Sequence, residues 1–80
     1  MNDRIRTAVA ECVGGIAPEA DLAHIDSKAS LREQLDIDSF DFLNLLIALQ
    51  QRLGIEVPEA DYRQVDSLDG LLEYLARRAG

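Results

Sequence analysis

The sequence has little of what several functional classes of small protein depend on. Its 80 residues include one cysteine, no tryptophan, two prolines and only eight lysine and arginine residues. A single cysteine excludes an intramolecular disulfide and a cysteine-rich zinc site. The shortage of bases, with a net charge of −7, argues against nucleic-acid binding. No apolar run approaches the roughly 20 residues that a membrane span requires.

The apolar content, in contrast, is high enough for a folded domain. Hydrophobic residues make up 48 % of the chain, more than a disordered segment would have. We expect one domain over residues 1–80, which is a monomer. We expect it to be cytoplasmic, because the first residues lack the apolar stretch of a secretory signal. A domain of this size buries only about 60 % of its unfolded surface, which argues against a deep catalytic cleft. We predict no enzyme activity and no catalytic residues.

The spacing of apolar residues predicts an all-α bundle of three main helices and one short helix. The first helix should be capped by Asn2 or Asp3 and end at Gly14-Gly15. A long loop follows over residues 18–38, packed as an ordered crossover with a helical turn near residues 30–34. The first helix has the apolar stripe Ile5, Val9, Cys12, Val13 and Ile16.

Two further helices complete the predicted bundle. The second should run from Ser39 to Leu53, followed by an extended Val57-Pro58 and a short helix over residues 59–63. The last should start near Ser67, with two arginines in its final turn that complement the helix dipole. Its stripe is Leu68, Leu71, Leu72, Leu75 and Ala79.

The second helix has more apolar residues than one core face needs. One stripe consists of Phe42, Leu45, Leu46, Leu49 and Leu53. On roughly the opposite side lie Phe40, Leu43 and Ile47, here called the apolar strip. Either the helix is central and both stripes are buried, or the apolar strip is exposed and docks partners. A bundle of 80 residues has difficulty surrounding one helix completely, which favours the second interpretation.

Acidic residues surround both ends of this helix. They are Glu33, Asp36, Asp38 and Asp41 near its start, and Glu56, Glu59 and Asp61 beyond its end. One interpretation is a solvated acidic face whose first members favour the helix dipole. Beside the apolar strip, the acids also suit the steering of a basic partner.

Two segments resemble the acyl carrier protein family. Asp38-Ser39-Phe40 resembles the Asp-Ser-Leu motif that opens the second helix there, and Gly54-Ile-Glu-Val-Pro58 resembles the Gly-Ile-x-Ile/Val-Pro segment after it. The tripeptide alone is a weak signal, but its distance from the second segment makes the pair specific. The similarity covers nearly the whole chain.

The resemblance implies a role for several residues. Ser39 would carry a 4′-phosphopantetheine arm, taken from coenzyme A, whose thiol holds acyl or aminoacyl groups as thioesters. Asp38 would contact the phosphopantetheinyl transferase that attaches the arm. The apolar strip, with Asp41, Glu56 and Asp61, would dock that transferase, a loading ligase and a downstream synthase or transferase.

The sequence also departs from the family pattern. The family often has Leu-Gly before the motif, where this chain has Leu35-Asp36, and Leu after the serine, where it has Phe40. Its second helix is less acidic, with Asn44 and Arg52 at positions that are often acidic. These departures favour a specialised carrier, for aminoacyl groups, a polyketide-like chain or a secondary metabolite, over a housekeeping fatty-acid carrier.

Three other sites compete with Ser39. Ser67 lies in a second Asp-Ser-Leu, but no Gly-Ile-x-Val-Pro follows, so Ser67 or Asp66 is interpreted as a helix cap. His24 lacks the surroundings of a hydrolytic triad. A calcium loop starting at Asp36 fails at its fifth and sixth positions, so no metal site is predicted. A protein-interaction bundle with the carrier fold that never takes the arm remains the alternative function.

Overall fold

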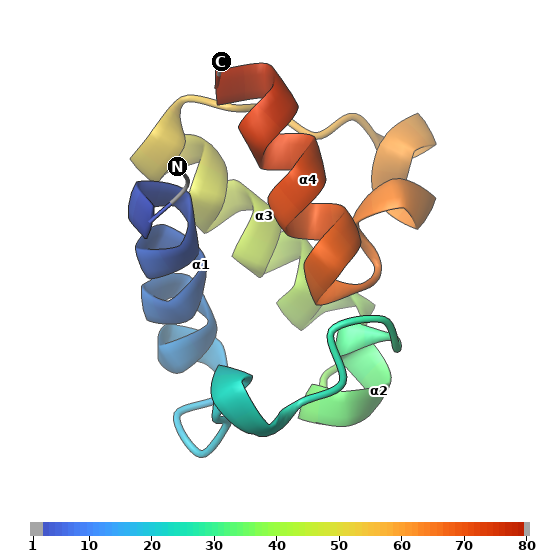
Figure 1. The fold of residues 1–80 in the computed structure, drawn as a ribbon. Helices are drawn as coiled ribbons and strands as arrows, with labels where there is room; N and C mark the ends of the chain where they lie inside the picture. The colour runs from blue at the N-terminus through green and yellow to red at the C-terminus, as the bar shows by residue number, and fades with distance from the viewer. Residues whose placement is uncertain (1–2, 80) are drawn as a thin grey trace.

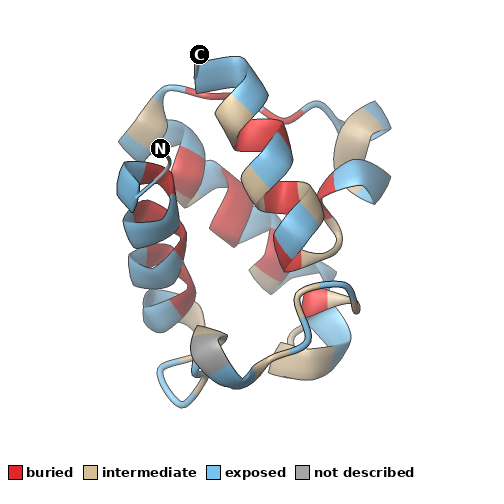
Figure 2. Ribbon diagram, viewed as in Figure 1, coloured by how far each residue is buried: buried red, intermediate tan, exposed pale blue. Residues whose placement is uncertain are grey.

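The computed structural model describes residues 3–79, apart from the side chain of Ala23, and is helical throughout its ordered elements. Three long helices, α1 (Asp3–Ile16), α3 (Ser39–Leu53) and α4 (Leu68–Ala79), pack around one core (Figures 1 and 2). Short elements connect them: η1 (Leu22–His24), α2 (Leu31–Leu35) and η2 (Glu59–Val65). The described part of the chain has no helix that is long and apolar enough to cross a membrane. The predicted all-α bundle is confirmed.

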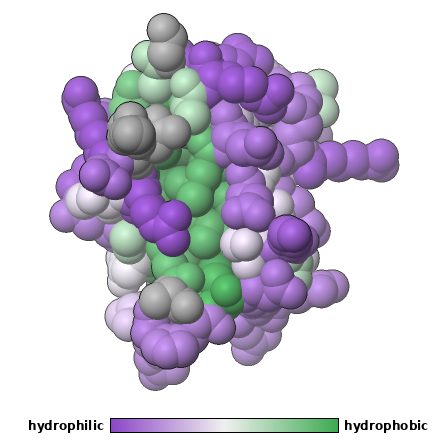
Figure 3. Space-filling model, in the orientation of Figure 1, coloured by the Kyte–Doolittle hydropathy of each residue, from purple (hydrophilic) through white to green (hydrophobic). Residues whose placement is uncertain are grey.

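The core is built from the apolar stripes of the three long helices. α3 contributes Phe42, Leu45, Leu46 and Leu49, and α1 contributes Ile5, Ala8, Val9, Cys12 and Val13. In the view of Figure 3, an apolar band runs between α1 and α4, which pack against each other. Burying these side chains stabilises the fold by roughly 1.5–3 kcal/mol for each large one.

The long loop after α1 is an ordered crossover, as predicted. Gln34 holds it from within α2, because its side chain accepts from the Asp26 amide at 2.6 Å and donates to the Asp26 carbonyl at 2.7 Å. Two backbone hydrogen bonds join it to the start of α4: Leu31 N to Asp66 O at 2.7 Å and Asp69 N to Ser27 O at 2.9 Å. These contacts fix α2, and therefore the start of α3.

Two details of the predicted helices were wrong, and one short element was missed. α1 continues through Gly14 and Gly15 to Ile16, because Ile16 packs on the core and the Ala17 amide still bonds to Val13 O. In α4 it is Tyr74 rather than Ala79 that is buried. The element η1 was not predicted. Asn2, one of the two caps proposed for α1, lies outside the described residues.

Asp36 occupies a backbone conformation that favours glycine. It ends α2 with φ 55° and ψ 45°, the left-handed region, where a side chain costs energy that glycine avoids. We therefore expect Asp36→Gly to raise the free energy of unfolding by about 0.5–1 kcal/mol in urea denaturation. The matched reverse change is Gly54→Ala, at φ 71° after α3, which should lower it. A loss of stability in Asp36→Gly would show that its carboxylate matters more than its backbone conformation.

Candidate functional site

Ser39 is the first residue of α3 and is exposed to solvent. Asp38 precedes it in an extended conformation and caps the helix, since its Oδ1 accepts from the Asp41 amide at 2.9 Å. The Asp38 carbonyl accepts from the Phe42 amide at 3.0 Å. The amides of Ser39 and Phe40 have no partner within the helix, as at any helix start. They place the positive end of the helix dipole beside the Ser39 side chain.

A pocket of about 330 Å³ opens beside this serine. The ring of Tyr62, on η2, meets the ring of Phe42 edge-on, with centroids 6.4 Å apart. The lining brings together α2, α3 and the η2 segment: Arg32, Ser39, Phe42, Tyr62, Arg63 and Asp66. Ser39 and Phe42 are near in sequence, but the other residues come from elements that only the tertiary fold places there. Sequence reasoning missed Arg32, Tyr62, Arg63 and Asp66 as neighbours of Ser39.

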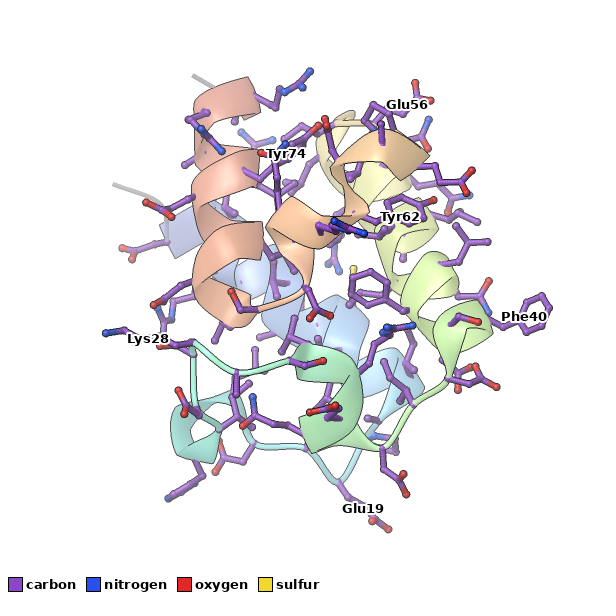
Figure 4. All side chains as sticks on the ribbon, turned by 90° about the vertical axis from the view of Figure 1, so that its right-hand side faces the viewer. Glu19, Lys28, Phe40, Glu56, Tyr62 and Tyr74 are labelled. Carbon is purple, nitrogen blue, oxygen red and sulfur yellow. The ribbon has the colours of Figure 1, made fainter. Side chains whose placement is uncertain are left out.

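The apolar strip on α3 is exposed, as the second interpretation predicted. Phe40 is 75 % exposed, Leu43 37 % and Ile47 42 %. Figure 4 shows Phe40 pointing away from the bundle into solvent. Ser39 therefore lies directly beside an apolar stretch of surface, whereas the other large apolar residues that the structure describes are packed on the core or partly buried against it.

The acidic residues predicted for docking differ in their surroundings. Glu56 is exposed, and Asp41 is half-buried at the start of α3. Asp61 is engaged within the fold, because its carboxylate accepts from the Tyr74 hydroxyl at 2.6 Å and from Arg78 at 3.4 Å. That hydrogen bond, followed by burial, raises the pKa of the Tyr74 phenol above its ordinary value. Asp61 thus anchors η2 to α4, a contact that the sequence did not predict.

The competing serine and histidine have structural partners. Ser67 is half-buried and caps α4, with its Oγ accepting from the Gly70 amide at 3.0 Å. Of the two residues predicted as the cap, Ser67 therefore takes this role, whereas Asp66 ends η2. His24 is exposed and its Nδ1 lies 2.5 Å from the Asp21 carboxylate, also at the surface.

Nearly the whole chain is similar to known proteins. Residues 3–75 match the family described as "Phosphopantetheine attachment site". The acyl carrier protein of Campylobacter hominis is 33 % identical over 73 residues, which cover 91 % of this chain and 86 % of that protein. The mitochondrial acyl carrier protein of Neurospora crassa is 27 % identical over 73 residues. The match covers 91 % of this chain but 54 % of the Neurospora protein, so the chain spans about half of that relative's length.

The fold also matches a solved structure. The solution structure of an Anaplasma phagocytophilum protein assigned as an acyl carrier protein superimposes with a TM-score of 0.82. The two chains are 22 % identical, and the match covers 99 % of this chain and 92 % of the other. This likeness shows that the bundle has the same fold.

Proposed function

Because the chain belongs to the acyl carrier protein family, whose prosthetic group is a covalently attached 4′-phosphopantetheine, we propose that Ser39 is the attachment residue of a carrier of acyl or aminoacyl intermediates. The observation that carries the proposal is the exposed Ser39 hydroxyl at the capped start of α3. The residues present suit the group, since the first amides of α3 favour a phosphate and the neighbouring pocket is open.

The chemistry divides between the chain and the prosthetic group. When bound, the arm supplies a thiol that holds acyl groups as thioesters. In the attachment step, Ser39 Oγ forms a bond to the β-phosphorus of coenzyme A, and 3′,5′-ADP leaves as its bond to that phosphorus breaks. The hydroxyl proton goes to a base of the transferase. The remaining work of this chain is to present Ser39 and to select partners: the transferase, a loading ligase and a downstream synthase or transferase.

Trypsin gives a direct test of the attachment residue, because each of the four serines falls in a different tryptic peptide. Ser39 lies in residues 33–52 and Ser67 in residues 64–77. After incubation with coenzyme A, magnesium and a broad-specificity phosphopantetheinyl transferase, intact mass should show one arm per chain. Peptide mass should then place it on residues 33–52. An arm on another peptide contradicts the assignment, and no arm favours an interaction bundle, provided that the transferase modifies a known carrier.

We expect partners to bind through the apolar strip, and a substitution at Ile47 tests this. Ile47→Glu should weaken binding of the transferase at least tenfold, because it places a charge in the middle of an apolar contact. The free energy of unfolding should change by only about 0.5 kcal/mol, since Ile47 is 42 % exposed. The control is Gln51→Glu, which adds the same charge one turn along α3 without removing apolar surface. If Ile47→Glu instead unfolds the protein, the strip belongs to the core.

A further inference from the structure

The pocket beside Ser39 contains more positive charge than its surroundings would suggest. The chain has a net charge of −7 and only eight lysine and arginine residues. Two of these eight, Arg32 and Arg63, line this one pocket, together with a single carboxylate, Asp66. Two guanidinium groups therefore lie in the same pocket as the candidate attachment residue, although the protein as a whole is acidic.

The two arginines are not equally available. Arg32 is partly engaged, because its Nε lies 3.9 Å from Asp66 Oδ1 and its guanidinium lies 5.9 Å from the centroid of the Phe42 ring. Asp66 in turn accepts from the Ser30 hydroxyl at 3.2 Å. Arg63 is exposed, and among the described residues no carboxylate lies within ion-pair distance of it. One guanidinium at the pocket is thus left to bind an anion from outside the chain.

An anion at this place follows from the proposed function, on which this inference rests. A phosphodiester on Ser39 Oγ brings one negative charge to the pocket, close to Asp38 and Asp41, which repel it. We propose that Arg63, assisted by Arg32, binds this phosphodiester. Guanidinium groups suit phosphate oxygens because they donate two parallel hydrogen bonds. The apolar part of the arm that follows the phosphate would then lie against the Phe42 and Tyr62 rings.

The test compares the apo protein with the arm-loaded protein in its free-thiol form, whose only new anion is the phosphodiester. The first measurement is the NMR signal of the Arg63 Nε–Hε group, which should shift on loading. The second is the melting temperature at low salt, which loading should raise by about 2–4 °C more in the wild type than in Arg63→Gln. The difference should shrink in 1 M salt.

Arg77→Gln is the matched control. It removes the same charge from an exposed arginine in the last turn of α4, beside the C-terminus and at the other end of the bundle from α2 (Figure 1). This variant should keep the wild-type gain on loading. The wild-type Arg63 signal gives an answer that does not depend on how any variant folds.

Each outcome has a distinct meaning. An Arg63 shift on loading, with a melting gain lost only in Arg63→Gln, supports the inference. The inference is overturned, while the carrier function stands, if the mass shows that the chain loads but the Arg63 signal does not shift and the melting gain on loading is the same in the wild type and in Arg63→Gln. A shift that appears only with a carboxylate cargo such as succinyl also overturns it, because the arginines would then hold cargo. A chain that takes no arm refutes the function and this inference together.

Discussion

Ser39→Ala should abolish attachment of the arm while leaving the protein as stable as the wild type. The change removes the only atom that could form the bond to phosphorus at this position. It should change the free energy of unfolding by no more than about 0.5 kcal/mol, because Ser39 is exposed and the cap of α3 comes from Asp38. The intact mass after incubation with the transferase and a thermal melt measure the two effects.

Ser67→Ala is the matched control, and the structure predicts the opposite pair of results. Ser67 Oγ accepts from the Gly70 amide at 3.0 Å, so its loss should cost about 1 kcal/mol and lower the melting temperature by roughly 4–8 °C. Loading of this variant should be complete at a temperature where it is folded. Attachment that persists in Ser39→Ala would overturn the assignment to Ser39, and attachment that disappears only in Ser67→Ala would move the site to the second Asp-Ser-Leu.

This pair of serines also shows how much the sequence can predict. The bounds of α3, the cap at Ser67 and the exposed apolar strip follow from local rules: cap residues, a glycine after the last turn and helical periodicity. Such rules depend on neighbours in the chain. They identify Ser39 as the start of a helix. Its proposed role as the attachment residue comes from the resemblance of its motif to that of the family.

The surroundings of Ser39 could not be predicted in the same way. Tyr62 and Arg63 reach the pocket because η2 packs against α4, and Asp66 reaches it because the long loop is joined to the start of that helix. Tyr74 was missed as a core residue because its hydroxyl needs a hydrogen-bond partner, and the half-buried Asp61 supplies one from 13 residues away. These are tertiary pairings, on which hydrophobic periodicity gives no information.

Gly14 and Gly15 illustrate the limit of a local rule. Paired glycines favour a helix end, at a propensity cost of about 1 kcal/mol for each glycine, yet α1 continues past them to Ile16, which is partly buried against the core. Both glycines face open space, with nothing within 4 Å of a Cβ built on either. Replacing either glycine with alanine should therefore remove its cost in helix propensity without a steric overlap.

Gly70 is the opposite case, and its replacement by alanine should cause a large loss of stability for the addition of one methyl group. It lies in the first turn of α4, where alanine is normally the better helix former. A Cβ at this position would meet the carbonyl oxygen of Gln64 at 2.2 Å. That oxygen belongs to the backbone of η2, so no side-chain rotation can relieve the overlap.

We therefore expect Gly70→Ala to lower the free energy of unfolding by about 1–3 kcal/mol, measured in urea, despite the gain in helix propensity. Gly14→Ala, the same substitution in open space, should raise it by about 0.5–1 kcal/mol. The opposite signs of these two changes in the free energy of unfolding would separate the effect of close packing from that of helix propensity. Because relief of the overlap requires η2 to move, and η2 carries Tyr62 and Arg63, the variant should also lose part of the extra melting gain on loading. An increase in stability at both positions would show that α4 and η2 do not approach each other this closely.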